Sequence, residues 1–161
     1  MTQRLHHMAY RCRDTEETRA FYEEVIGLPL AAALPIEGTA TGRRVRAMHS
    51  FFQMKDGSFL AFFEVEGAPF DFKPQHDFDL HMALEADQAD VDRARAAAEA
   101  RGIEVRGPSD HGFIQSTYFR DPNGYVIELA VKTEAHAEFS AEAPKSAHQI
   151  LAAWRAGAAA A

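Results

Sequence analysis

The sequence consists of two halves that show the same order of strand-like and helical patterns. The first half begins with a strand-like run at 5–12, and a helical stretch follows that Asp14 can cap at its N-terminus. The second half begins with a strand-like run at 79–85 and continues into an alanine-rich helix over 89–100. The repeat length of about 70 residues indicates a duplicated module, and this duplication limits the possible folds more than any other feature.

Each half then ends in a β-hairpin. The four strands of the two hairpins are expected over 45–54, 58–65, 114–120 and 125–131. Asp56-Gly57 and Asn123-Gly124 mark the turns, because glycine supplies the positive φ that tight hairpins need. Each half therefore reads β-α-β-β-β, and neither half can close a barrel alone. The sequence predicts an α+β fold in which paired βαβββ modules form a half-open barrel around a shared cleft.

The repeat also sets the domain boundaries. We expect one domain over 1–132, with modules at about 4–66 and 78–132 and a linker rich in Pro, Asp and Phe between them. The C-terminal tail covers 133–161. Within it, 133–144 is expected to be irregular, and 146–156 is expected to form a short amphipathic helix that packs on the domain or on a second subunit.

Composition and charge exclude several classes of protein. The 161 residues are 47% hydrophobic and 25% charged, which is typical of a globular domain. The net charge of -7 opposes binding to nucleic acid, and the single cysteine, Cys12, excludes an internal disulfide and a cysteine-based zinc site. No segment is long and apolar enough to span a bilayer. We therefore expect a cytoplasmic protein that acts on a small molecule and binds neither nucleic acid nor a membrane.

Two histidines and one glutamate stand out from this background. His7 and His81 occupy equivalent positions in the first strands of the two modules, and Glu128 lies within the apolar run of the last strand. A carboxylate in such a run is costly to bury unless it is paired or bound to a metal. Two imidazoles and one carboxylate on rigid strands leave three octahedral positions open. We predict a divalent metal at these three residues, and the ligand set suits Fe(II), Mn(II), Ni(II), Co(II) or Zn(II).

Each of the three residues also has a structural interpretation. His7 and His81 can be core histidines, and Glu128 can pair with an arginine such as Arg11. For any one residue alone this interpretation is favoured, since structural ion pairs also bury such groups. The equivalent positions of the two histidines in the repeat favour the metal.

The repeat is imperfect at the fourth possible ligand. Counted from the hairpin glycines, Gly57 and Gly124, the position that corresponds to Glu128 holds Ala61. Glu64 lies three residues further on, and its odd spacing places it on the opposite face of the strand. We therefore expect one ligand from the first module, two from the second, and no fourth.

A longer set of motifs points to a known family. The motifs are His7-Met8-Ala9-Tyr10-Arg11, Asp14, Phe21-Tyr22, Gly27-Leu28-Pro29, His81-Met82-Ala83-Leu84 and 118–128. With them the chain resembles the vicinal oxygen chelate superfamily over about residues 4–132. That superfamily includes glyoxalase I, fosfomycin- and bleomycin-resistance proteins, and type I extradiol dioxygenases. The resemblance implies paired modules around a metal that polarises vicinal oxygens of a substrate, and it implies a homodimer.

The second module also resembles the signature of extradiol dioxygenases. That signature is His, Tyr, Asp-Pro-x-Gly and Glu, represented here by His111, Tyr118, Asp121-Pro122-Asn123-Gly124 and Glu128. Ser109 and Thr117 depart from it, because apolar residues are usual at those two positions. The resemblance implies that Tyr118 hydrogen-bonds a metal-bound oxygen, that His111 helps with proton transfer, and that Fe(II) is the favoured metal.

Other aromatic and histidine residues have two interpretations each. His49 shares a strand face with Phe51 and is a further catalytic candidate, or else a half-buried strand residue. His111 can instead be a solvent-facing turn residue, and Tyr118 an aromatic that fills the wall of the cleft. His6 is expected on the face opposite His7. The other phenylalanines of the first hairpin are expected mainly in the core, with one face available as an aromatic wall for an apolar substrate.

Three functions compete. The leading hypothesis is a metal-dependent extradiol-type dioxygenase that acts on a small catecholic or related vicinal-oxygen substrate. The alternative is a non-redox, glyoxalase-like isomerase, lyase or thiol transferase that uses Zn, Mn, Ni or Co, although Ala61 disfavours the glyoxalase I version. A further alternative is a metal-free small-molecule binding protein, which has no need of His7, His81 and Glu128 together.

Overall fold

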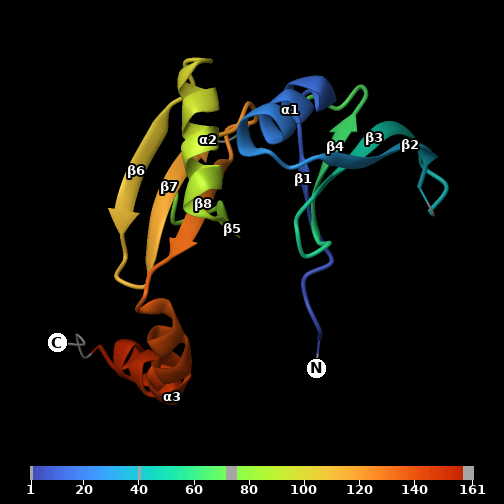
Figure 1. Ribbon diagram of the computed structural model, residues 1–161. Helices are drawn as coiled ribbons and strands as arrows, with labels where there is room; N and C mark the ends of the chain where they lie inside the picture. The colour runs from blue at the N-terminus through green and yellow to red at the C-terminus, as the bar shows by residue number, and fades with distance from the viewer. Residues whose placement is uncertain (1, 40, 72–75, 158–161) are drawn as a thin grey trace.

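The computed structural model describes residues 2–39, 41–71 and 76–157, and its strands form two four-stranded mixed sheets (Figure 1). The first sheet has the order β1-β4-β3-β2, made of β1 (His7–Arg11), β2 (Leu30–Gly38), β3 (Arg44–Gln53) and β4 (Phe59–Val65). The second has the order β5-β8-β7-β6, made of β5 (His81–Glu85), β6 (Val105–Asp110), β7 (Ile114–Arg120) and β8 (Val126–Lys132). In each sheet only the first strand is parallel to its neighbour. The predicted α+β class with paired βαβββ modules is confirmed, and within the described residues the sheets do not close into a barrel.

One helical layer packs on each sheet. Helix α1 (Thr15–Phe21) begins where Asp14 Oδ1 accepts a hydrogen bond from the Glu17 amide at 2.8 Å, and it continues into a π-helical turn, η1 (Tyr22–Ile26). Gly27 ends the turn with φ at +88°, a conformation that favours glycine. Helix α2 (Gln88–Glu99) covers the second sheet and also contacts η1. The buried side chains of both modules therefore form one continuous core.

Polar contacts also join the two modules. The Tyr22 hydroxyl donates to Asp121 Oδ2 at 3.1 Å, and the Tyr125 hydroxyl donates to the Arg11 carbonyl at 3.0 Å. Tyr22 and Asp121 are both buried, and such groups need partners because they have lost their hydration. These contacts lie on the helix side of the sheets and fix how the modules sit within one chain.

The C-terminal tail differs from the sequence prediction. Helix α3 extends over His136–Arg155, so most of the segment expected to be irregular is helical, and Pro144 lies inside the helix. Alanine and glutamate have high helix propensity, and this outweighs the local break that the proline suggests. Phe139 stacks on Phe113 at 3.8 Å between ring centroids, and α3 otherwise projects from the second sheet (Figure 1). Across the described ranges, no helix is long and apolar enough to cross a membrane.

Candidate metal centre

Two of the three predicted ligands lie together on the second sheet. Glu128 on β8 is in register with Ala83 on β5 and with Tyr118 on β7, so these side chains share one face of the sheet. His81 Nε2 lies 3.2 Å from Glu128 Oε2, and the Ser116 hydroxyl donates to Glu128 Oε1 at 2.5 Å. Glu128 is only 5% exposed. A buried carboxylate with an imidazole at one oxygen and a hydroxyl at the other is held in a fixed orientation.

The linker orients the ring of His81. His81 Nδ1 lies 2.8 Å from the carbonyl oxygen of Asp77. When Nδ1 carries the proton and donates it to this carbonyl, the lone pair of Nε2 points towards Glu128. Metal-binding histidines usually have such a partner at their second nitrogen, because it fixes both the tautomer and the plane of the ring.

His111 and Tyr118 form a pair next to the carboxylate. His111 lies in the turn between β6 and β7, and its Nε2 is 3.0 Å from the Tyr118 hydroxyl. His111 is exposed, as its solvent-facing interpretation predicts, yet its ring is in contact with the tyrosine. The structure therefore brings His81, Glu128, Tyr118 and His111 to one sheet.

His7 lies on the other sheet, among aromatic side chains. The ring centroids of His7 and His49 are 6.3 Å apart, and the ring of His49 stacks on Phe63 at 3.6 Å with an interplanar angle of 9°. His49 is 8% exposed, and its Nδ1 lies 3.1 Å from the Phe62 carbonyl oxygen. His49 is thus a buried strand residue beside His7 rather than a neighbour of Tyr118.

His6 does not lie where alternation predicts. Its Nδ1 is 2.8 Å from Nδ1 of His7, so both imidazoles are on the same side. The prediction was wrong because β1 begins only at His7, and strand alternation does not apply to the residue before it.

Glu64 lies on the face that the sequence predicted. It points to the helix side of the first sheet, where it accepts a hydrogen bond from the Thr15 amide at 2.7 Å.

The strand registers bear out the asymmetry of the repeat. Ala61 is in register with Ala9 and Phe51, just as Glu128 is with Ala83 and Tyr118. The first sheet therefore has an alanine at the position where the second has its carboxylate.

The ionic alternative for Glu128 is also decided by the contacts. The Arg11 guanidinium donates to the Ala68 carbonyl at 2.6 Å and does not pair with Glu128. Of the basic side chains in the described ranges, only His81 lies within ion-pair distance of Glu128, and an imidazole is charged only when it is protonated. A buried carboxylate without a permanent cation, next to an oriented imidazole, is a donor set that fits a divalent metal. No group of three or more His, Cys, Asp or Glu side chains close enough to hold a metal occurs among the described residues of one chain.

The family model for this fold matches most of the chain. The model described as Glyoxalase/Bleomycin resistance protein/Dioxygenase superfamily matches residues 4–129. The chain belongs to this superfamily. A search of curated proteins gave no match.

Solved structures show the same superfamily fold. A glyoxalase/dioxygenase from Nostoc punctiforme is 28% identical, with a TM-score of 0.58, and the match covers 82% of this chain and 92% of that one. A point mutant of the fosfomycin resistance protein FosX from Listeria monocytogenes, solved with Mn(II) and dihydroxypropylphosphonic acid, is 20% identical with a TM-score of 0.62, over 85% and 98% of the two chains. The antibiotic binding protein TnmS3 from Streptomyces sp. CB03234 is 23% identical with a TM-score of 0.59, over 82% and 98%.

Sequence reasoning missed three residues that contact Glu128, Tyr118 or His81. Ser116 shares its strand face with Tyr118, and alternation along β7 was a sufficient signal to find it. Arg106 is in register with Tyr118, which required the pairing of β6 with β7. Asp77 lies in the linker, where no periodic pattern places a carbonyl next to an imidazole.

Proposed function

We propose that two copies of this chain form a dimer in which His7 of one copy joins His81 and Glu128 of the other to hold a divalent metal. Both β1 and β5 lie at the edge of their sheet, and they do not pair with each other. The first three residues of β1, which are His7, Met8 and Ala9, are all exposed, so this edge strand is not covered by the rest of the chain. An exposed apolar edge strand favours pairing with another chain.

A cleft between the two modules supports the same arrangement. Its volume is about 930 Å³, and apolar side chains contribute much of its lining, among them Leu5, Met8, Leu28, Met82, Leu84 and Leu129. Leu5 is 51% exposed and Met8 39% exposed. Burial of these side chains against a second copy gives a hydrophobic contribution to dimer formation.

We propose further that the dimer is an extradiol-type dioxygenase for a small vicinal diol on an aromatic ring. The observation that carries this proposal is the His111–Tyr118 pair: His111 Nε2 is 3.0 Å from the Tyr118 hydroxyl, and Tyr118 is in register with the buried Glu128. A bound Fe(II) supplies adjacent open positions for a chelating diol and for dioxygen. The Tyr118 hydroxyl can donate to a substrate oxygen, and His111 can accept the proton that this oxygen loses, because imidazole exchanges protons near neutral pH.

The first sheet supplies an apolar wall in this arrangement. His49, Phe51 and Phe63 form a continuous aromatic surface on the face that carries His7, with 4.1 Å between the ring centroids of His49 and Phe51. A planar substrate ring can pack there while its two oxygens face the metal ligands. The alanine at position 61 supplies no fourth protein ligand, and this leaves room for a third exogenous ligand, which dioxygen chemistry needs and the glyoxalase I type does not.

The test uses anaerobically purified full-length protein. Elemental analysis measures bound metal, and oxygen consumption is followed after addition of Fe(II) and a panel of catechols. The proposal predicts retained metal and catechol-dependent oxygen uptake. Retained metal without oxygen uptake contradicts the dioxygenase and favours the non-redox alternative. Failure to retain any of Fe, Mn, Co, Ni or Zn contradicts both and favours the metal-free binding protein.

A further inference from the structure

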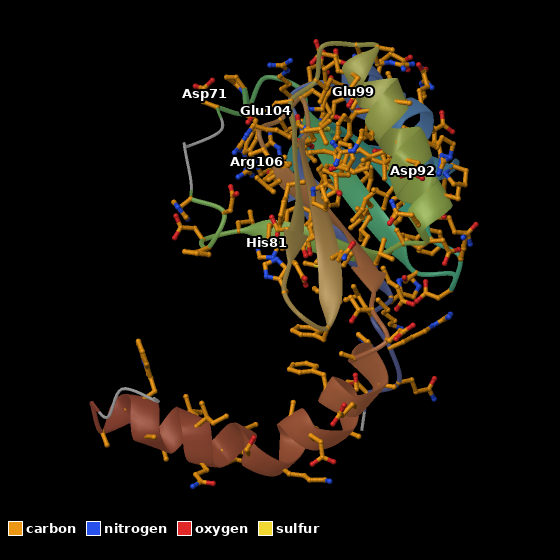
Figure 2. The ribbon with its side chains drawn as sticks, turned by 60° about the vertical axis from the view of Figure 1, so that its left-hand side comes forward. Asp71, His81, Asp92, Glu99, Glu104 and Arg106 are labelled. Atoms are coloured by element: carbon orange, nitrogen blue, oxygen red, sulfur yellow. The ribbon has the colours of Figure 1, made fainter. Side chains whose placement is uncertain are left out.

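Arg106 lies at the end of a row of side chains that begins at the candidate ligand Glu128. Arg106 on β6 is in register with Tyr118 on β7, and Tyr118 is in register with Glu128 on β8. Because neighbouring strands are about 4.8 Å apart, the backbone of Arg106 is about 10 Å from that of Glu128. Figure 2 shows Arg106 and His81 on the side of the second sheet that faces away from α2.

The guanidinium of Arg106 is held beside the tyrosine. Its Cζ atom lies 5.5 Å from the centroid of the Tyr118 ring, and its Nη2 pairs with Asp77 Oδ2 at 2.5 Å. Asp77 is also the residue whose carbonyl accepts from His81. The same linker residue therefore positions a metal ligand and this arginine at a fixed spacing.

The acidic neighbours of Arg106 do not occupy all of its N–H donors. Asp77 also pairs with Arg120, at 3.6 Å, so one carboxylate serves two guanidinium groups. Glu104 is 3.9 Å from Arg106 Nε, and its side chain is 69% exposed, so solvent screens that pair. The side chain of Arg106 is 45% exposed, and of its N–H groups only Nη2 donates a hydrogen bond to another described residue. Arg106 therefore keeps N–H donors beside the Tyr118 ring that its acidic neighbours do not occupy.

Arg120 does not have the same freedom. Its Nη1 donates to the Gly124 carbonyl at 2.7 Å, so it is tied to the hairpin turn between β7 and β8. Arg106 has no comparable bond to the backbone within the described ranges. Of these two arginines, Arg106 is the one that is not held by a backbone carbonyl and whose guanidinium lies over the Tyr118 ring.

We propose that Arg106 binds a carboxylate substituent on the substrate, so that the preferred substrate is an aromatic vicinal diol that carries a carboxylate. This inference rests on the proposed function, because the diol end must reach His81 and Glu128. Arginine suits this role because its planar fork donates two parallel hydrogen bonds to a carboxylate. Tyr118 lies between Arg106 and Glu128 in the row, so the substrate ring must lie next to it.

The test compares two diols that differ only in the group that Arg106 would bind. Values of kcat/KM are measured for 3,4-dihydroxybenzoate and for 4-methylcatechol with the metal-loaded protein. Hydrogen bonds to charged groups contribute enough for a preference of about ten- to a hundredfold for the carboxylate. In Arg106→Gln this ratio falls towards one, mainly through KM, whereas Arg106→Lys keeps an intermediate ratio.

The matched control is Arg95→Gln. Arg95 lies on α2, in the opposite layer of the same module, and donates to the Gly107 carbonyl at 3.3 Å. Its substitution removes the same charge without touching the site, so the substrate ratio stays at the wild-type value. If Arg95→Gln lowers the ratio as much as Arg106→Gln, general electrostatics explain the preference and the inference is wrong.

Calorimetric binding of the two diols without oxygen separates this inference from the proposed function. Turnover of both diols with equal kcat/KM overturns the role of Arg106 and leaves the dioxygenase intact. If neither diol is turned over, the dioxygenase is wrong. In that case, tighter binding of the carboxylated diol that is lost in Arg106→Gln still supports the anion site, and equal binding overturns it.

Discussion

Glu128 and Asp121 are both buried carboxylates, but their surroundings differ. Asp121 is 4% exposed, and its partners are all uncharged: the Tyr22 hydroxyl, the Asn123 amide group and the backbone amides of Asn123 and Tyr125. Burial raises the pKa of Asp121, and these hydrogen bonds only partly oppose the rise. Glu128 instead faces an imidazole across an open sheet face. Asp121 therefore joins the modules, while Glu128 is available to a ligand.

Removal of the Glu128 carboxylate is expected to abolish metal retention. Glu128→Ala deletes one of three proposed donors, while Glu85→Ala deletes an exposed carboxylate on β5 that pairs with Lys132 at 2.7 Å. Elemental analysis after dialysis should find metal in wild type and in Glu85→Ala, but not in Glu128→Ala. Full metal content in Glu128→Ala would show that the ligand set is wrong.

Loss of the Tyr118 hydroxyl is expected to slow turnover without affecting metal binding. Tyr118→Phe keeps the ring but removes the group 3.0 Å from His111 Nε2. Loss of one hydrogen-bond donor to a reacting oxygen typically lowers kcat about a hundredfold. Tyr10→Phe is the control. Tyr10 lies on the first sheet, on the face opposite His7, and its hydroxyl contacts Met8. Equal kcat for Tyr118→Phe and wild type would remove Tyr118 from the mechanism.

The raised pKa of Asp121 predicts a specific dependence of stability on pH. The native state binds the Asp121 proton more tightly than the unfolded state, where aspartate has a pKa of about 3.9. This contribution to the free energy of unfolding is fully present below that value and is lost as the pH rises through the native pKa. The variant Asp121→Asn has no carboxyl group to titrate and therefore lacks this contribution. The stability difference between wild type and variant, from urea unfolding, should therefore shrink as the pH rises, and a constant difference would contradict the assignment.

At the scale of elements, strands with glycine turns were predictable and the C-terminal helix was not. The strand expected over 114–120 agrees with β7, because Asn123-Gly124 fixes the turn that follows and alternation fixes the face. Helix α3 begins ten residues earlier than the sequence predicted. Its first turns are anchored by Phe139 on Phe113, a contact with another element that no local pattern reveals.

The stacked pair is expected to hold the start of α3 on the domain. Phe139→Ala removes an aromatic contact that is worth about 1 kcal/mol beyond its area. We expect faster proteolysis near residues 133–136, while the melting temperature of the domain stays unchanged. Trp154→Ala is the control, because that side chain is 77% exposed on the same helix. Equal proteolysis of both variants would argue against this anchor.

At the scale of the whole molecule, the repeat predicts which residues can bind metal. It does not predict how the two modules are arranged relative to each other. The sequence places His7 and His81 at equivalent positions, and the strand registers agree with that equivalence. The arrangement of the modules depends on contacts such as Tyr22 with Asp121, whose partners are far apart in the chain. Those contacts lie on the helix side, and within one chain His7 and the His81–Glu128 pair remain on separate sheets.

Metal content of a mixed dimer tests the composite site most directly. His7→Ala and Glu128→Ala chains carry different affinity tags, are expressed together, and the dimers that carry both tags are purified. Each variant alone should bind no metal. The mixed dimer has one site with His7 from one chain and His81 and Glu128 from the other, so we predict half the metal content of the wild-type dimer. A mixed dimer without metal, or a wild-type protein that binds metal as a monomer, would contradict a site shared between two copies.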